Sequence, residues 1–199
     1  MQFNNALQEI CNTSVMKAVA AMSKTLNTTL KFDIKDIKIE PIQKIDLPDH
    51  FNESIVGLYV SIDSSIKGGS VLMSTTKSAL ATCDLMLSRD EGCTHQITEV
   101  EESALKELVN IVLGNFLTSF AHSLFTTSLM HSPAIYEQDT STAITRHIRS
   151  TLSNTIGENR VVNIAFTYEH SNIKGDINIV LGENRINYLL KKMIALTTG

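Results

Sequence analysis

The stretch Ser103–Asn115 reads SALKELVNIVLGN and determines how the rest of the chain is interpreted. It lies in a predicted amphipathic helix that begins at a capping-box pattern, Thr98-Glu99-Val100-Glu101, and continues to about Leu124. Within it, Ser103, Glu107 and Asn110 are spaced i, i+4 and i+7, so their side chains share one stripe of the helix. Such a stripe is typical of a solvated surface, but it is also how a helix presents a polar site. The stretch alone leaves both interpretations open.

The same polar spacing occurs again near the N-terminus, at Asn5, Glu9 and Asn12. A second local identity supports a duplication, because SSIKGG at 64–69 resembles SNIKGD at 171–176; we call the separation between these two stretches the repeat spacing. The repeat spacing is slightly longer than the separation between the two polar triplets. The second half therefore has room for an inserted helix between its polar triplet and its SNIKGD stretch. The pattern predicts a chain built from two related halves, at about 1–90 and 97–199, within a single domain spanning 1–199.

Hydrophobic periodicity supports this division. Apolar residues at three- and four-residue steps predict helices, and alternation at two-residue steps predicts strands. In the first half we expect a helix over 3–27, a strand over 30–39 with a register break near Lys35-Asp36, a hairpin of strands 55–62 and 70–73, and a helix capped by Ser74 or Thr75. After the central helix we expect an edge strand over 130–136, an additional helix over 139–156, a hairpin of strands 161–166 and 177–181, and a helix over 187–196.

The predicted fold class is therefore α+β, with two pseudo-two-fold-related α-β-β-β-α halves that share one antiparallel sheet. Pairing the strands of both halves into one sheet would protect an edge of each half.

Composition excludes several classes of protein. A hydrophobic content of 43% with 19% charged residues argues against disorder, and a net charge of −4 gives no electrostatic case for nucleic acid. No apolar run reaches the roughly 18 residues that a membrane span needs, and the N-terminus does not resemble a signal peptide. The three scattered cysteines, Cys11, Cys83 and Cys93, favour reduced thiols. We therefore expect a cytoplasmic protein with no membrane partner.

The central stretch resembles the CheC family of chemotaxis phosphatases, which includes CheX and the flagellar switch protein FliY. The signature of that family is Asp or Ser, three residues, Glu, two residues, Asn, and then twenty-two residues to a Pro. Ser103, Glu107, Asn110 and Pro133 meet every position of it. The resemblance is strong over 98–136, and in the order of elements it covers nearly the whole chain.

The resemblance implies that the two long helices lie side by side on one surface of the sheet. It also implies an enzyme, a phosphatase acting on the phosphorylated aspartate of a CheY-type response regulator. The family assigns the attacking water to the Asn and docking of the regulator to the Glu, here Asn110 and Glu107. No cofactor of its own is implied, because the Mg²⁺ that neutralises the phosphoryl charge would belong to the regulator.

The first copy departs from this signature. Asn5 replaces the Asp or Ser, Met16 stands where the second copy has Gly114, and Lys35 falls at the position of the Pro. Glu9 and Asn12 remain, so this copy is a second candidate site that is active, weakened or vestigial. We expect Glu107 and Asn110 to be the principal catalytic pair and keep Glu9 and Asn12 as further candidates.

A binding function is the alternative to catalysis. In it, a CheC-like scaffold engages the receptor deamidase CheD or another signalling partner with little turnover. A role like that of FliY is less expected, because no rotor-binding domain follows residue 199. Among rival sites, Cys93-Thr94-His95 lacks the further ligands of a zinc site, and Gly114 is expected to allow close packing between the two long helices.

Overall fold

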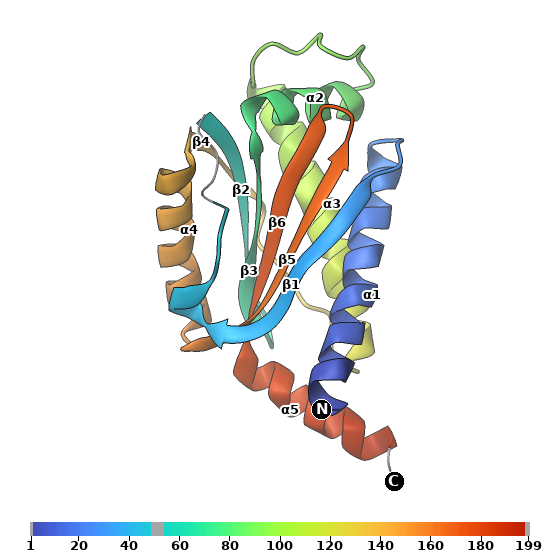
Figure 1. Ribbon diagram of the computed structural model, residues 1–199, viewed down its shortest axis with the longest axis vertical. Coiled ribbons are helices and arrows are strands. Elements are labelled where there is room, and N and C mark those ends of the chain that lie inside the picture. The colour runs from blue at the N-terminus through green and yellow to red at the C-terminus, as the bar shows by residue number, and fades with distance from the viewer. Residues whose placement is uncertain (1, 49–53, 198–199) are drawn as a thin grey trace.

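The computed structural model describes residues 2–48 and 54–197 and has one layer of helices on a six-stranded sheet, with a further helix on the opposite face (Figure 1). The first half contributes α1 (Gln2–Thr25), β1 (Lys31–Pro41), the short 3-10 helix η1 (Ile42–Lys44), β2 (Ser54–Asp63), β3 (Lys67–Thr75) and α2 (Thr76–Met86). The second half contributes α3 (Glu99–Ser123), β4 (Ile135–Thr140), α4 (Ser141–Ile156), β5 (Arg160–His170), β6 (Ile173–Gly182) and α5 (Glu183–Thr197).

The sheet is shared by both halves and has the order β1-β5-β6-β3-β2-β4, with every neighbouring pair antiparallel. If β1, β2 and β3 are matched with β4, β5 and β6, the order reads the same from either edge, which is the predicted pseudo-two-fold relation. Each half also gives its first strand to the other, since β1 pairs with β5 and β4 pairs with β2. The predicted α+β fold class is confirmed.

The centre of the pseudo-two-fold lies between β3 and β6, and it explains the repeated Ile-Lys-Gly sequence. A Cβ added at Gly68 would lie 2.3 Å from the carbonyl oxygen of Val180, and one added at Gly175 would lie 2.9 Å from that of Met73. Gly68 matches Gly175, and Met73 matches Val180, each pair being separated by the repeat spacing. The duplicated glycines therefore allow the two halves to approach closely at the middle of the sheet.

The core divides by sheet face, as strand alternation requires. One face packs against α1 and α3, which lie side by side as expected from the family resemblance (Figure 1). The opposite face is covered in part by α4, whose inner residues follow a four-residue step and are all buried: Ile144, Ile148, Leu152 and Ile156. This is the inserted helix predicted over 139–156.

Several local predictions are confirmed. The register of β1 against β5 shifts between Ile34 and Asp36, where the break was expected. Thr75 caps α2, its hydroxyl oxygen accepting from the backbone N–H of Ser78, and α3 ends at Ser123 with Leu124 as its C-cap, close to the expected end.

Several strand positions were predicted wrongly, including those of the second hairpin, whose strands run over Arg160–His170 and Ile173–Gly182 and not over 161–166 and 177–181. The edge strand expected over 130–136 is β4, at Ile135–Thr140. Pro133 precedes it, in the gap between the isolated bridge Ile62–His131 and the first β4 pair, because proline cannot donate to a ladder. The second strand of the first hairpin begins at Lys67 and not at Ser70, because Gly68 and Gly69 pair with β2 and β6 instead of forming the turn.

Candidate functional site

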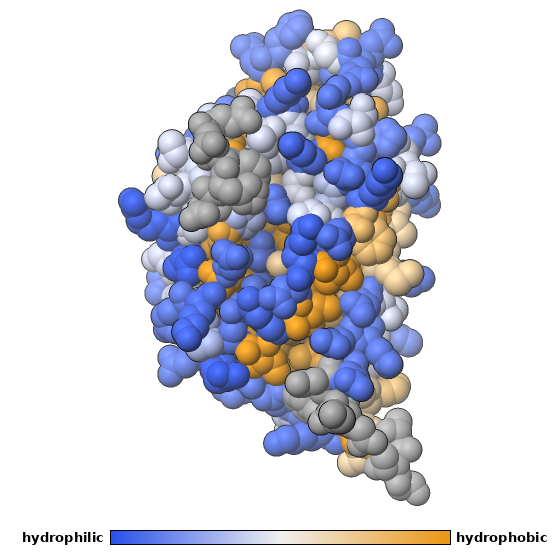
Figure 2. Space-filling model, viewed as in Figure 1, coloured by the Kyte–Doolittle hydropathy of each residue, from blue (hydrophilic) through white to orange (hydrophobic). Residues whose placement is uncertain are grey.

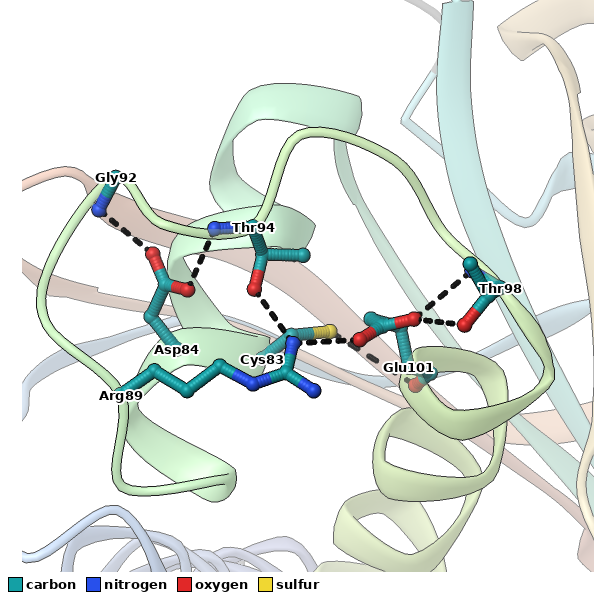
Figure 3. Close-up of polar contacts among 7 residues, drawn as sticks. All are labelled: Cys83, Asp84, Arg89, Gly92, Thr94, Thr98 and Glu101. Carbon is teal, nitrogen blue, oxygen red and sulfur yellow. Dashed lines mark hydrogen bonds and ion pairs between the residues drawn. The ribbon is translucent and has the colours of Figure 1, made fainter.

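The central helix starts where the sequence predicted, and a polar network holds its N-terminus in place (Figure 3). Thr98 and Glu101 form the capping box, in which a Glu101 carboxylate oxygen accepts from the backbone N–H of Thr98 at 3.0 Å. The other carboxylate oxygen of Glu101 pairs with the Arg89 guanidinium at 2.6 Å, and that guanidinium also donates to the Thr94 hydroxyl at 2.9 Å. The connection between α2 and α3 is thereby tied to the first turn of α3.

Asp84 organises the other end of this network. Its side chain is buried at the end of α2, and its two oxygens accept from the backbone N–H groups of Gly92 and Thr94, at 2.7 and 3.0 Å. Burial alone would raise the pKa of Asp84, but the hydrogen bonds from Thr94 and Gly92 outweigh it and lower the pKa. The buried carboxylate of Asp84 therefore holds the polar segment 88–97 between the halves in place. This segment in turn sets the direction in which α3 begins.

Acid should loosen this network. The hydrogen bond from the Thr98 hydroxyl, followed by the contact with Arg89, lowers the pKa of Glu101 to about 2. A carboxyl whose pKa is lower in the folded than in the unfolded protein stabilises the fold above its unfolded pKa, and this contribution is lost as pH falls toward the folded value. We expect a Glu101→Gln variant to melt below wild type at pH 7, with the difference shrinking between about pH 4 and pH 2. A difference that stays constant over this range in thermal melts would contradict the assignment.

The predicted stripe is present on α3, on the side away from the core. Ser103 and Glu107 are exposed and Asn110 is half-buried, whereas Leu105, Leu108 and the other inward-facing residues of the helix are buried. The Glu107 carboxylate has neither a hydrogen bond nor an ion pair within residues 2–48 and 54–197. The structure therefore brings Ser103, Glu107 and Asn110 together on one face, with the Glu107 charge open to a partner.

Asn110 differs from its neighbours on the stripe because part of its side chain is turned inward. The side-chain carbonyl oxygen, Oδ1, is buried, and it has no hydrogen-bond partner among the described residues. A buried acceptor without a partner costs about 1–3 kcal/mol, so a fold keeps one only at a cost in stability. Such an acceptor can take a hydrogen bond from a water molecule or from a bound group.

The segment that follows α3 passes beside the stripe. A Cβ placed on Gly114, one turn beyond Asn110, would lie 3.9 Å from Nε2 of His131, the nearest described atom apart from the two neighbouring residues and the backbone of α3 itself. Further along, burial and then the nearby Glu102 carboxylate raise the pKa of Tyr136. The stripe therefore borders residues 131–136. The expected role of Gly114 in packing the two long helices together was wrong, because its open side faces His131 and not α1.

The first copy is arranged differently. Asn5, Glu9 and Asn12 are all exposed on α1, and Met16, in the position of Gly114, is 59% exposed. Lys35, in the position of Pro133, lies at the bulge of β1 and pairs with Asp33. Only residues 26–30 connect α1 to β1, whereas 124–134 connect α3 to β4. The first copy therefore keeps the polar spacing without a segment like that of His131 beside it.

The two copies do not form one combined site. The hydroxyl of Ser14 on α1 donates to that of Ser119 on α3 at 3.3 Å, which places these positions level with each other. Asn12 is two residues from Ser14, whereas Asn110 is nine residues from Ser119, or about 13 Å along the helix. Each copy must therefore work alone.

The sequence did not identify His131 or the network of Asp84, Arg89 and Thr94. These residues make contacts between separate turns and loops, which local sequence patterns do not reveal. Only for His131 was there a signal, its position two residues before Pro133. Within the described ranges, no group of three or more His, Cys, Asp or Glu side chains could hold a metal ion. No helix in those ranges is both long and apolar enough to cross a membrane.

Comparison with known proteins supports the resemblance. The model of the CheC-like family matches residues 100–128, which contain the whole polar stripe. Over 96% of this chain and 94% of the other, the structure is similar to FliY from Thermotoga maritima, with 18% identity and a TM-score of 0.71. CheX from Desulfovibrio desulfuricans has 14% identity and a TM-score of 0.56, over 87% of this chain and 99% of CheX. The FliM middle domain from H. pylori has 11% identity and a TM-score of 0.59, over 96% of this chain and 98% of that domain. The predicted resemblance to the CheC family is confirmed, in the central helix and in the fold.

Proposed function

We propose that this chain, with its CheC-like fold and central helix, is a phosphatase of response regulators. It would hydrolyse the phosphorylated aspartate of a CheY-type regulator, with Asn110 positioning the attacking water and Glu107 docking the regulator. One observation carries the proposal: Asn110 lies on an exposed stripe next to the unpaired carboxylate of Glu107, and no hydrogen bond from a described residue holds its side-chain carbonyl in place.

The chemistry suits these side chains. Hydrolysis of an acyl phosphate requires a water in line with the bond from phosphorus to the aspartate oxygen. The water oxygen bonds to phosphorus as that bond breaks, the aspartate leaves as a carboxylate, and the two protons of the water end on the phosphate product. Positioning and charge stabilisation supply most of the acceleration in such transfers. The amide of Asn110 holds a donor and an acceptor on one plane and does not titrate, so it can orient a water at any physiological pH.

The chain needs no cofactor of its own in this account. The Mg²⁺ that neutralises the phosphoryl oxygens is held by the regulator, so each protein supplies half of the complete site. The partner is a cytoplasmic signalling protein, and we propose the same compartment for this chain.

Glu107 should control docking. Its carboxylate is exposed and lies one turn from Asn110, so it can pair with a lysine of the regulator. Reversal of the charge in a Glu107→Lys variant should weaken binding of the phosphorylated regulator by at least about tenfold, because like charges then meet at the interface. Titration by fluorescence anisotropy measures this affinity. The matched control is Glu9→Lys, which makes the same change at the exposed first copy; equal losses in both variants would contradict the assignment to the second copy.

A binding module is the second candidate. The same fold occurs in the FliM middle domain, and the first copy has lost part of the signature, which leaves the surface of α1 available for a partner such as CheD. The two candidates differ in one measurement, the rate at which a phosphorylated CheY-type regulator loses phosphate in the presence of this protein. Faster loss supports the phosphatase, and binding without faster loss supports the module.

A further inference from the structure

The segment after α3 holds one imidazole in a fixed orientation beside the proposed site. His131 is half-buried, and its Nδ1 lies 2.8 Å from the backbone carbonyl oxygen of Ser132. A carbonyl oxygen only accepts hydrogen bonds, so Nδ1 carries the proton. In the neutral ring Nε2 is then an acceptor, and it has no hydrogen-bond partner among the described residues.

The backbone around His131 is anchored, which distinguishes it from a loose surface loop. His131 bridges to Ile62 at the end of β2. The N–H of Ser132 donates to the carbonyl oxygen of Ser61 at 2.8 Å, and the Ser132 hydroxyl oxygen accepts from the N–H of Ser61 at 3.1 Å. The two hydroxyls also lie 3.0 Å apart. The sheet therefore sets the position of the imidazole before any partner binds.

Gly114 keeps the space between this ring and the stripe open. Apart from the two neighbouring residues and the backbone of α3, the nearest described atom to a Cβ at Gly114 would be Nε2 of His131, at 3.9 Å. Asn110 lies four residues earlier, so its side chain and the position above Gly114 are neighbours on the helix surface. A longer side chain at 114 would occupy this space, and the matching position of the first copy carries such a side chain, the exposed Met16.

The first half has no equivalent of this imidazole. The bridge Ile62–His131 matches the pair Lys31–Glu169, since Ile62 and Glu169 are separated by the repeat spacing. Lys31 therefore stands where His131 would be, and a lysine ammonium cannot accept a hydrogen bond. Both copies keep the Glu and Asn of the signature, but only the second copy has an imidazole acceptor at this position.

We infer that His131 is a further substrate-contacting residue of the α3 site, whose Nε2 accepts a hydrogen bond from the water that Asn110 positions. This role rests on the proposed phosphatase function. Hydrogen bonds to both the Asn110 amide and the His131 imidazole restrict the orientation of one water molecule more than a hydrogen bond to Asn110 alone. His131 moves no proton in this account; it restricts the orientation of the water before attack.

The test compares two substitutions at the same position. His131→Phe keeps a ring next to Gly114 and removes the acceptor, so kcat for phosphate loss from a phosphorylated CheY-type regulator should fall about tenfold with KM nearly unchanged. His131→Gln restores an acceptor and should recover activity to within about threefold of wild type. The matched control is His122→Phe, an exposed histidine in the last turn of α3, which should behave as wild type.

The possible outcomes separate this inference from the proposed function. A wild-type protein that does not accelerate phosphate loss would overturn the phosphatase itself. If wild type accelerates and Asn110→Ala does not, but His131→Phe retains full kcat, only the role of His131 is overturned. A rise in KM with kcat unchanged, or a loss in His131→Gln as deep as in His131→Phe, would also overturn it. Circular dichroism of each variant confirms that the fold is kept.

Discussion

An Asn110→Ala variant should lose at least about 100-fold in the rate of phosphate loss from the regulator, with little change in affinity. Loss of orientation of a reacting group costs about this much, because the water is then no longer held in line with the breaking bond. Binding should survive, since the exposed carboxylate of Glu107 remains and the alanine stays on the surface of an intact helix. Single-turnover rates at saturating enzyme measure the chemical step, and anisotropy measures the affinity.

The same substitution in the first copy is the control. Asn12→Ala removes an equally spaced amide from α1, where neither an anchored imidazole nor a glycine gap accompanies it. We expect Asn12→Ala to keep most of the wild-type rate. A fully active Asn110→Ala combined with an inactive Asn12→Ala would transfer the site to Glu9 and Asn12. Full activity in both single variants would mean that either copy suffices or that the mechanism is wrong.

Replacement of Gly68 should destabilise the fold more than any other single added methyl discussed here. A Cβ at this position would lie 2.3 Å from the backbone carbonyl oxygen of Val180, and backbone atoms of a central strand cannot move aside cheaply. Gly68→Ala should therefore lower the free energy of unfolding by about 3 kcal/mol, at the upper end of what overpacking costs. For a chain of this length that corresponds to a fall in Tm of roughly 6–12 °C, measurable by calorimetry.

Gly114→Ala is the matched control for stability. It adds the same methyl group, but the nearest atom would lie 3.9 Å away, at ordinary contact distance. Within a helix, alanine is favoured over glycine by roughly 0.5–1 kcal/mol, so this variant should melt at or slightly above the wild-type temperature. If Gly68→Ala melted like Gly114→Ala, β3 and β6 could tolerate a side chain between them without a loss of stability. The explanation of the repeated glycines would then be wrong.

The sequence predicted the fold well where periodicity and repetition agree. The recurrence of 64–69 at 171–176 predicted the duplication, and the capping box predicted the start of α3. Predictions failed where tertiary contact overrode local preference. Gly68 and Gly69 are typical turn residues, but here they belong to β3, where β6 approaches Gly68 and the side chains of Leu152 and Tyr59 approach Gly69 too closely for a side chain. The last helix begins at Glu183 and not at Asn187. Its first turn is polar, so the spacing of apolar residues gives no sign of where the helix begins.

The candidate site was only partly predictable, for a similar reason. Helical spacing is a local property, so Ser103, Glu107 and Asn110 could be placed on one face from the sequence. The approach of His131 to Gly114 depends on the path of residues 124–134, which bridge to β2 at His131, and no local pattern specifies this path. The inward direction of the Asn110 carbonyl likewise follows from packing and not from residue type. Figure 2 shows another face of the molecule, that of α4 and β1, where hydrophilic residues surround a hydrophobic patch near the middle.

The most direct test of the proposed function uses the unmodified chain. A CheY-type regulator is phosphorylated with a small-molecule phosphodonor, freed of excess donor, and mixed with increasing amounts of this protein in the presence of Mg²⁺, and phosphate loss is followed over time. The rate of phosphate loss should rise with protein concentration and then saturate, at the concentration where anisotropy shows that binding is complete. Saturable binding with an unchanged rate of phosphate loss would contradict the proposed function and would leave a binding module.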